Sequence, residues 1–356
     1  MSTTVEAARP PERKAGSIGL LLLQLRTFIA LFAVLIFFGI AAPNFASTAN
    51  IILMSQQVAL NAILSLGMTF VIITGGIDLS VGSIVGLSGM IAGALILYGV
   101  DTHTGWTVFF SVPEVCIIVL VIGTLIGAIN GLLITRLNVA PFIATLGVLY
   151  VARGAALLSS NGNTFSNLVG SPRLGTQGFP FLGEGTILGL PVAIWFMVVL
   201  GLLCAYVAAR TPLGRHVYAV GGNERAAGLS GVKVNRVKMI VYMFSGFCSA
   251  LVGLVIASEL VAAQPATGET FELTAIAAVV LGGTSMSGGR GTIGGTIVGA
   301  FVIGILSEGL VMMGVSTFWQ IVVKGLVIIL AVVVDQAQRK LQSRAVLRQL
   351  ARTAAA

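Results

Sequence analysis

Long apolar runs alternate with short polar segments along almost the whole chain of 356 residues. A helix that crosses the hydrocarbon core of a bilayer needs about 20 mainly apolar residues, and windows of that length predict ten membrane-spanning helices. They cover residues 27–43, 51–74, 80–99, 115–135, 140–159, 189–209, 239–262, 272–286, 293–313 and 317–335. We therefore expect an all-α polytopic membrane protein.

One long polar segment, residues 210–238, interrupts this pattern and carries six of the chain's twenty Lys and Arg residues. A basic side chain at the centre of a bilayer costs roughly 2.5–3.5 kcal/mol, so this segment is expected to lie in water. If both termini and this segment are cytosolic, seventeen Lys and Arg lie inside and only Arg173 lies outside, while Arg153 and Lys324 fall within spans. Since basic residues collect on the cytosolic side, this distribution predicts cytosolic termini.

The chain is expected to have three parts. Residues 1–26 form a cytosolic tail with an interfacial helix, residues 27–335 form the transmembrane domain, and residues 336–356 form a basic cytosolic tail. The segment 17–26 is expected to be the interfacial helix, because Arg26 would be costly inside the bilayer.

Composition supports a membrane protein and excludes several other classes. The chain is 56% apolar and only 9% charged, whereas a soluble protein has about 25% charged residues. The net charge of +8 comes from basic residues at the ends of apolar runs, without interleaved aromatics, so we expect contact with lipid and not with nucleic acid. Cys116, Cys204 and Cys248 each stand alone in apolar runs, which indicates packing rather than a metal site or a disulfide.

Motifs of catalysis are missing from the sequence. There is no GxxxxGK[ST] phosphate loop, so we expect no ATP hydrolysis by this chain itself. His103 and His216 have no second metal ligand near them in sequence, and GLSGM (86–90) ends in Met where a nucleophile elbow has Gly. We expect no catalytic residue, and neither metal nor cofactor bound by this chain.

A polar stripe runs along the predicted span 51–74. Gln57, Asn61, Ser65 and Thr69 follow one another at steps of four residues, which places them on one helix face. A polar face toward lipid is expensive, so the stripe is expected to face other helices or a wet cavity. Two interpretations remain open, namely hydrogen bonding between helices and a path for a hydroxyl-rich solute.

Two charged residues, Glu308 and Lys324, lie at similar depth in the predicted hairpin of the last two spans. We predict that they pair, as a structural ion pair in preference to a proton or ion relay.

Glycines recur at four-residue spacing, which allows helix backbones to approach closely. They are Gly82 and Gly86, Gly89 and Gly93, Gly123, Gly127 and Gly131, and Gly291, Gly295 and Gly299. Two turns that begin with Gly-Gly, GGIDLSVGSIVG (75–86) and GGTSMSGGRGTIGG (282–295), are both expected at cytosolic ends of spans. Interrupted segments often mark a translocation pathway. The polar segment 160–188 is expected outside, either as an ordered docking surface or as a plain loop.

Several stretches resemble the permease subunits of ribose-type ATP-binding cassette (ABC) importers, and the similarity runs nearly from end to end. The stretches are PNFASTANIILMSQQVALNAILSLGMTFVIITGGIDLSVGS (43–83), NVAPFIATLGVLYVARGAAL (138–157), YAVGGNERAAGLSGVKVNRVK (218–238) and ELTAIAAVVLGGTSMSGGRGTIGGTIVGA (272–300).

This resemblance implies a multi-pass permease of the bacterial inner membrane that works as a homodimer or heterodimer. It would receive a pentose-type monosaccharide or a similar small polyol from a periplasmic solute-binding protein. Cytosolic ABC ATPase subunits, which carry the ATP and Mg, would drive it. The sequence leaves the solute open. The competing class is a secondary transporter driven by an ion gradient, for which Glu259 and Glu308 are the plausible intramembrane acids.

The resemblance also suggests what the segment 210–238 does. Asn223 suits an N-cap, Glu224 suits a first helical turn, and Gly231 suits a stop, so a short helix is expected between them. A helix of this length needs a partner surface to be stable, and a groove on an ATPase would supply one. Gly221 and Gly222 are expected to give a flexible entry. The residues expected to couple the permease to the ATPase are Gly221, Gly222, Asn223, Glu224, Ala226, Ala227, Leu229, Ser230 and Gly231.

The pathway is expected to include Asp78, Phe142 and Thr145 beside the polar stripe. Asp78 precedes the third span, where an acid favours the start of a helix. We expect it to cap that helix in preference to lining an inner gate.

Overall fold

The computed structural model describes residues 17–102, 105–330 and 332–333. The expected basic tail 336–356, the first sixteen residues of the expected N-terminal part, and His103 lie outside the described residues.

Ten helices of the described chain fall at the ten expected spans, and this confirms the prediction of an all-α polytopic membrane protein. Six are long and apolar enough to cross a membrane, and the others are shorter apolar helices. The ten are α1 (Ser17–Ala41), α2 (Thr48–Ile73), α3 (Val81–Leu97), α4 (Val112–Thr135), α5 (Pro141–Leu158), α7 (Val192–Arg210), α10 (Val234–Glu259), α11 (Phe271–Leu281), α12 (Ile293–Met312) and a helix over Thr317–Leu330 that carries no label.

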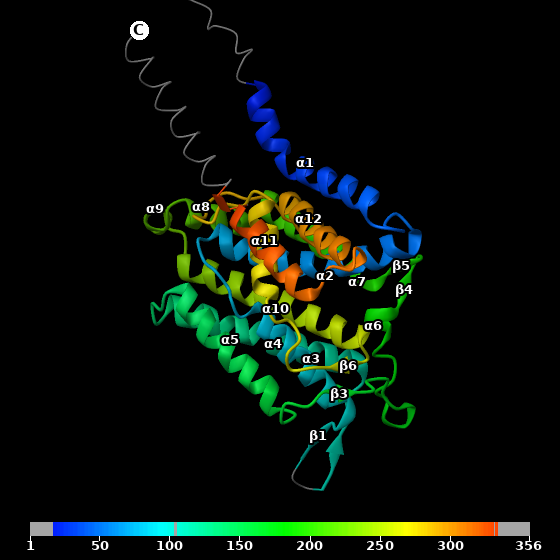
Figure 1. The fold of residues 1–356 in the computed structure, drawn as a ribbon. Coiled ribbons are helices and arrows are strands. Elements are labelled where there is room, and N and C mark those ends of the chain that lie inside the picture. The colour runs from blue at the N-terminus through cyan, green and yellow to red at the C-terminus, as the bar shows by residue number, and fades with distance from the viewer. Residues whose placement is uncertain (1–16, 103–104, 331, 334–356) are drawn as a thin grey trace, which may run out of the picture.

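Short elements occupy the two ends of the bundle. At the end expected in the cytosol, α8 (Pro212–Gly222) and α9 (Glu224–Leu229) connect α7 to α10. The opposite end, called here the outer end, carries α6 (Phe181–Glu184) and three antiparallel pairs of two-residue strands. The pairs are β1 (Val100–Asp101) with β2 (Thr107–Val108), β3 (Phe165–Ser166) with β6 (Ala262–Ala263), and β4 (Thr186–Ile187) with β5 (Leu190–Pro191). In Figure 1, α9 projects at the left edge, and β4 and β5 lie at the right.

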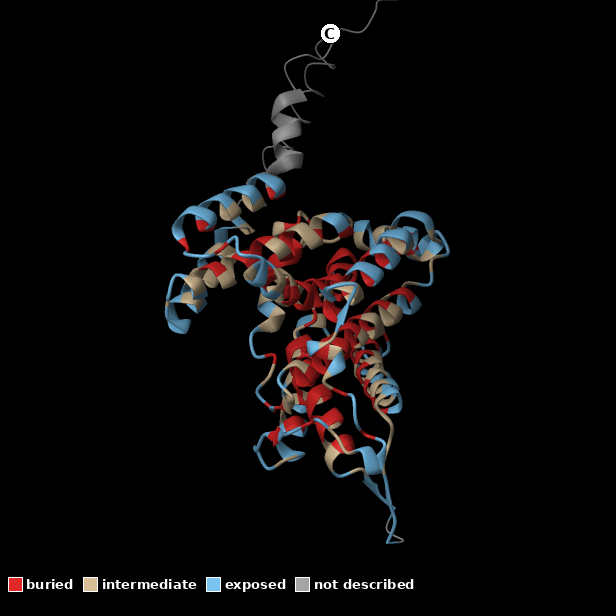
Figure 2. Cartoon of the chain, turned by 90° about the vertical axis from the view of Figure 1, so that its right-hand side faces the viewer, coloured by how far each residue is buried: buried red, intermediate tan, exposed pale blue. Residues whose placement is uncertain are grey.

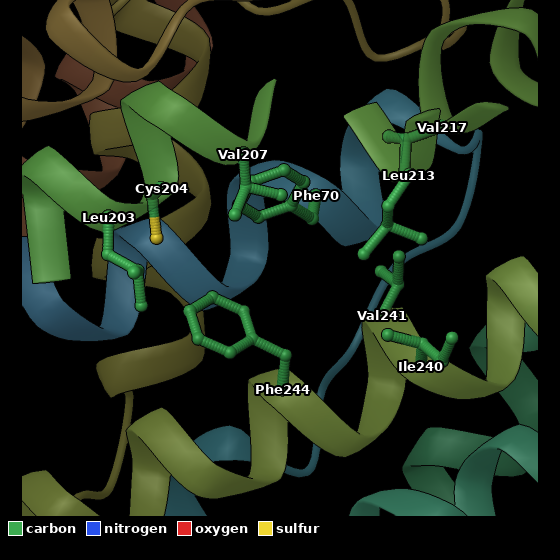
Figure 3. Close-up of a pocket in the computed structure, with 9 residues that line it drawn as sticks. All are labelled: Phe70, Leu203, Cys204, Val207, Leu213, Val217, Ile240, Val241 and Phe244. Atoms are coloured by element: carbon green, nitrogen blue, oxygen red, sulfur yellow. The ribbon is translucent and has the colours of Figure 1, made fainter. Parts of the chain in front are cut away.

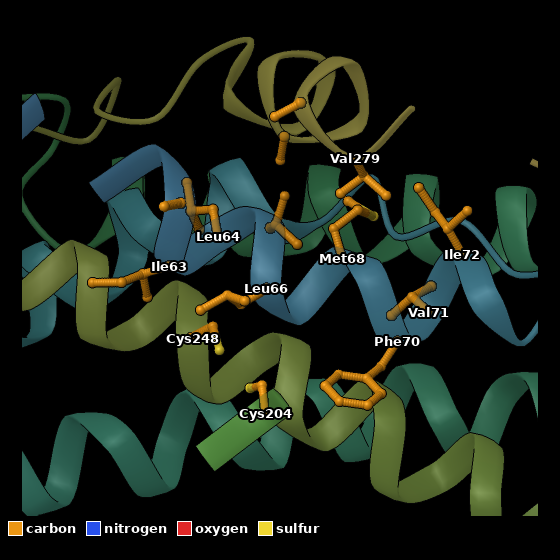
Figure 4. Packing of buried hydrophobic residues seen from close by; sticks show 14 of the residues in the cluster. Ile63, Leu64, Leu66, Met68, Phe70, Val71, Ile72, Cys204, Cys248 and Val279 are labelled. Carbon is orange, nitrogen blue, oxygen red and sulfur yellow. The ribbon is translucent and has the colours of Figure 1, made fainter. Parts of the chain in front are cut away.

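Helix α2 forms the centre of the bundle. It contacts α7, α10, α11 and α12, and its apolar side chains, among them Leu66 and Met68, are fully buried in the largest hydrophobic cluster (Figure 4). The buried residues gather in the middle of the molecule, whereas the peripheral helices expose their apolar side chains (Figure 2). Such exposure on outer helices is what contact with lipid requires.

Glycines let α4 and α10 approach each other closely. A methyl group on Gly123 would meet Ala250 and the carbonyl of Gly246, and one on Gly127 would meet the carbonyl of Tyr242. For this pair of helices, the prediction of close backbone packing through glycines is confirmed.

The glycines of α3 serve a different purpose from the one expected. Gly86 faces the carbonyl groups of Pro265 and Thr267, and Gly82 faces that of Gly268. Both glycines therefore make room for a non-helical strap, residues 263–268, and the expectation of a second helix at these two positions is wrong. This strap follows the predicted span 239–262 at its outer end, yet it runs along α3 into the bundle.

Because of this strap, α11 begins deep in the bundle. It has eleven residues, which at 1.5 Å per residue gives about 16 Å, roughly half of a hydrocarbon core of about 30 Å. Non-helical backbone at such depth occurs where it is buried in protein or lines a wet cavity.

The structure refines two further expectations, one for the outer segment 160–188 and one for residues 17–26. The segment 160–188 is packed rather than loose, because Leu168 and Phe179 are fully buried. The segment expected as a separate interfacial helix, residues 17–26, is continuous with the first span in α1.

Candidate functional site

The short helix expected after Asn223 is present as α9. The side-chain oxygen of Asn223 accepts a hydrogen bond from the amide of Ala226 at 3.0 Å, which is the N-cap arrangement. Glu224 lies in the first turn, and Gly231 takes a left-handed conformation with φ of +87° just beyond the helix.

The side chains of α9 divide into a docked set and a free set. Ala227 is buried against the main hydrophobic cluster, and Glu224 forms an ion pair of 2.7 Å with Lys238 of α10. Ser230 donates a hydrogen bond to the carbonyl of Ala226 at 3.0 Å. Leu229, by contrast, is 86% exposed. Leu229 is thus the large apolar side chain of α9 that this chain leaves uncovered.

Gly221 and Gly222 do not form a flexible entry to α9, as the sequence suggested. They are the last two residues of α8, which begins after the N-cap Thr211. Val217 and Val220 bury one face of α8, while Arg215 and His216 are exposed on the other. Because the buried positions are few and basic residues stand between them, a search for long apolar runs does not find α8.

Gly221 lies at a junction of three segments that are distant in sequence. The amide of Gly289 donates a hydrogen bond of 2.9 Å to the carbonyl of Ile73, and a methyl group on Gly221 would collide with both groups. The turn 282–295 therefore meets the end of α2, directly before the turn 75–86, at the end of α8. A methyl group on Gly288 would also meet the amide of Gly75, so the two glycine turns touch there. We call this contact of Ile73, Gly221 and Gly289 the glycine junction.

Tyr218 fastens α8 to the second of these turns. Its hydroxyl donates a hydrogen bond of 2.9 Å to the carbonyl of Gly291. Burial raises the pKa of Tyr218, which keeps the hydroxyl in its donating form. Beside the junction, a cavity of about 340 Å³ is lined by Gly221, Asn223, Glu224 and Lys238 among others.

A second cavity, of about 150 Å³, lies between α2, α7, α8 and α10 (Figure 3). Its side chains, which include Phe70, Leu203 and Phe244, are all apolar. It offers no hydrogen-bonding group to a hydroxyl-rich solute.

The polar stripe of α2 is divided between two environments. Ser65 and Thr69 are fully buried and donate to carbonyls one turn back on the same helix, at 2.7 and 2.6 Å. The hydroxyl of Thr69 also lies 2.8 Å from that of Thr296 on α12. At these two positions the stripe makes contacts within and between helices. Gln57 and Asn61 are half-buried and line a cavity.

That cavity, called here the outer cavity, measures about 160 Å³ and lies between α2, α11, α12 and the helix Thr317–Leu330. Glu308 and Lys324 both line it, and their opposite charges attract each other. Within the described residues, no contact of 4.0 Å or less joins the two side chains. Their pairing as a structural ion pair stays a prediction.

Asp78 lies fully buried in a polar network. One carboxylate oxygen accepts hydrogen bonds from the amide and hydroxyl of Ser80, at 3.0 and 2.6 Å, and the other accepts from Ser245 of α10 at 2.7 Å. Asn130 of α4 donates to the hydroxyl of Ser80 at 2.8 Å. Ser80 holds the N-cap position of α3 without a side-chain capping bond. Asp78 therefore lies two residues before that position and accepts the amide of Ser80, instead of being the N-cap residue itself.

The remaining two pathway candidates lie at the start of α5. Thr145 is fully buried and donates to the carbonyl of Pro141 at 2.8 Å. Phe142 is 53% exposed on the surface of the bundle. Neither residue lines the outer cavity.

Arg153 is the residue whose role the sequence did not indicate. From α5 its guanidinium donates to the carbonyls of Pro265 and Thr267, the latter at 2.9 Å. It lies between Glu269 and Glu272, which both attract its charge. Arg153 thus satisfies backbone groups that the non-helical strap cannot pair by itself. An Arg inside a predicted span was the available signal.

Comparison with known proteins shows that the chain is similar to membrane permeases. Residues 50–332 match the family described as "Branched-chain amino acid transport system / permease component". The ribose import permease protein of Bacillus subtilis (strain 168) is 46% identical over 315 residues, which cover 88% of this chain and 92% of the relative. The ribose import permease protein of Escherichia coli (strain K12) is 39% identical over 318 residues, covering 89% and 95%.

A third relative, the xylose transport system permease protein of the same E. coli strain, is 33% identical over 383 residues, covering 91% of this chain and 95% of the relative. No solved structure matches the chain.

Proposed function

The chain belongs to this permease family, as a membrane subunit of an ABC importer, and from that premise we propose that it carries a pentose-type monosaccharide or a similar small polyol into the cytosol. The relatives named for ribose and xylose support this class of solute. The polar side chains of the outer cavity, which lies among otherwise apolar helices, also support it. The family places the chain in the bacterial inner membrane as a multi-pass protein.

The energy comes from separate ATPase subunits that bind ATP and Mg in the cytosol. The chain's own contribution is α9, and the exposure of Leu229 is the observation that carries this part of the proposal. Burying a Leu side chain contributes about 1.5–3 kcal/mol. A groove on an ATPase subunit accepts Leu229, while Ala227 and the Glu224–Lys238 ion pair hold α9 against this chain.

Movement of α9 reaches the bundle by two routes. The ion pair to Lys238 leads into α10, whose Ser245 holds Asp78 at the start of α3. The last turn of α8 leads into the glycine junction, where the turns before α3 and α12 meet. ATP binding that draws two ATPase subunits together therefore shifts α3, α10 and α12 against α2, and the bundle opens alternately to the two sides.

Three further components complete the machine. A second permease subunit, identical or different, pairs with this chain, and the lipid bilayer surrounds both. A periplasmic solute-binding protein delivers the solute to the outer end, where the packed segment 160–188 offers a surface for docking.

Uptake into proteoliposomes tests the function. The permease is reconstituted with its ATPase subunits, ATP is enclosed, and labelled D-ribose is added outside with the binding protein. We expect uptake that requires ATP and persists when an uncoupler abolishes ion gradients. Uptake that proceeds without ATP and stops with the uncoupler would instead identify an ion-gradient-driven transporter.

A further inference from the structure

We propose that the outer cavity is a binding station for the transported solute, in which Asn61, Glu308 and Lys324 bind its hydroxyl groups. The proposal rests on the proposed function, because it takes the solute to be an uncharged polyhydroxylated molecule.

Polar groups converge on the outer cavity from every helix that surrounds it. Gln57 and Asn61 come from α2, Thr274 comes from α11, and Ser307 and Glu308 come from α12. Lys324 of the helix Thr317–Leu330 completes the lining. All of these helices are apolar along most of their length, so a cluster of polar side chains at one level needs an explanation beyond packing.

Some of these polar groups already have partners in the protein. The amide of Gln57 donates to Glu259 at 2.9 Å. The hydroxyls of Thr274 and Ser307 donate to carbonyls one turn back on their own helices. These side chains line the cavity, but their hydrogen-bond donors are already bonded to other groups of the protein.

Three groups of the lining have no such partner. Within the described residues, no hydrogen bond or ion contact joins the amide of Asn61, the carboxylate of Glu308 or the ammonium of Lys324 to another protein group. All three side chains are half-buried in the bundle. Polar groups inside a bundle are normally paired, so a cavity with three unpaired ones is arranged for a partner that enters from outside.

The chemistry of the three groups suits adjacent hydroxyls. A carboxylate only accepts hydrogen bonds, an ammonium only donates them, and an amide does both, whereas each hydroxyl of a sugar or polyol can donate and accept. Glu308 and Lys324 together contribute no net charge, which suits a neutral solute.

The position of the cavity suits a station reached from the outer end. Gln57 lies in the first half of α2 and Asn61 lies near its midpoint, while Ser307 and Glu308 lie in the last turns of α12. The cavity therefore extends from the middle of the bundle toward the outer end. The glycine junction is at the other end of α2, beside Ile73. A solute released at the outer end therefore meets this cavity before it meets the junction that responds to the ATPase.

Thiol labelling tests access and binding in the assembled transporter. Asn61→Cys is compared with Ser65→Cys, which is one turn away but fully buried. Labelling is measured against the unsubstituted chain, whose Cys204 and Cys248 are buried and whose Cys116 is half-buried, so that any labelling of Cys116 is subtracted. We expect a water-soluble maleimide to label Asn61→Cys at least tenfold faster than Ser65→Cys, and D-ribose at saturating concentration to slow this labelling at least threefold. Protection by L-leucine and not by ribose, or equal labelling with and without ribose, overturns the proposal.

A double-mutant cycle distinguishes solute binding from a structural ion pair. Glu308→Gln, Lys324→Met and the double variant are compared for ATP-driven ribose uptake and for thermal stability. If the two residues bind solute, the double variant stays at least tenfold slower than the unsubstituted transporter although its stability is normal. If uptake returns in the neutral double variant, the residues form only a structural pair and the station is refuted.

The two hypotheses fail in different ways. Normal ATP-driven ribose uptake in Asn61→Leu and in the double variant would refute the proposed binding station and leave the proposed function unaffected. Absence of ATP-driven sugar uptake by the unsubstituted transporter would refute the proposed function itself.

Discussion

The amide of Gly289 donates a hydrogen bond of 2.9 Å to the carbonyl of Ile73, and this bond joins the turn 282–295 to the end of α2, more than two hundred residues earlier in sequence. Gly221 fits against the same bond from α8. The end of α8 is therefore in contact with the end of α2 and with the turn before α12 at the same point.

A side chain at Gly221 should break this arrangement. Its first carbon would collide with backbone groups of Ile73 and Gly289, which cannot rotate away. We expect Gly221→Ala to destabilise the protein by about 1–3 kcal/mol, as overpacking does, and to reduce uptake per ATP hydrolysed. Gly222→Ala is the matched control, because a methyl group there meets nothing within 4 Å. Thermal unfolding in detergent should show a lowered midpoint for the first variant alone.

Loss of the exposed side chain of α9 should detach the ATPase. If Leu229 is buried on binding, Leu229→Ser removes about 1.5–3 kcal/mol of apolar contact, which corresponds to roughly 10–150-fold weaker association. The permease itself should stay folded, since this side chain is 86% exposed. Leu188→Ser serves as control, because Leu188 is 87% exposed at the outer end. Equal co-purification of the ATPase with both variants would contradict the docking role of α9.

The ion pair between Glu224 and Lys238 should matter more for coupling than for stability. It is partly exposed, and such pairs contribute at most about 1 kcal/mol. We expect Glu224→Lys to leave the unfolding midpoint nearly unchanged and to lower the amount of solute imported per ATP hydrolysed. Adding Lys238→Glu restores opposite charges and should restore the ratio of solute imported to ATP hydrolysed. A ratio that stays low in the double variant would show that the pair has no part in coupling.

Removal of the guanidinium of Arg153 should release the strap. Arg153→Met leaves the carbonyls of Pro265 and Thr267 without their donor, and the loss of hydrogen bonds to a charged group costs about 1.5–3 kcal/mol each. We expect a lower unfolding midpoint and faster proteolysis within the strap, residues 263–268. Arg173→Met, at an exposed position of the packed segment 160–188, should change neither measurement. Unchanged proteolysis in Arg153→Met would mean that the strap is held by other contacts.

The features that the sequence predicted are those that depend on local chemistry. Ten apolar runs became ten helices because length and apolarity decide which segments can enter a bilayer. The helix after Asn223 was predictable because an N-cap residue, an acidic first turn and a terminal glycine lie within nine positions. The helix α8 was missed because only a narrow face of it is apolar.

The features that escaped prediction depend on contacts between distant segments. Nothing near Gly82 or Gly86 in the sequence distinguishes a glycine that faces a helix from one that faces a strap. The outer cavity likewise combines side chains from four helices, and the unpaired state of Asn61 is visible only when all of its neighbours are in place. Hydropathy could place Arg153 in a span, yet only the packed structure shows which carbonyls it binds.

The strap and the half-length α11 have a consequence for how the protein is made. During synthesis the segment around residues 263–281 emerges with acidic residues and too short an apolar run to integrate into the bilayer unaided. Two earlier helices form the surface that binds this segment. Gly82 and Gly86 of α3 make room for the strap, and Arg153 of α5 donates hydrogen bonds to it. Stable insertion of the strap and α11 therefore requires contacts with α3 and α5, which are translated more than a hundred residues earlier. The helices of the bundle are thus expected to assemble in the order in which they are made.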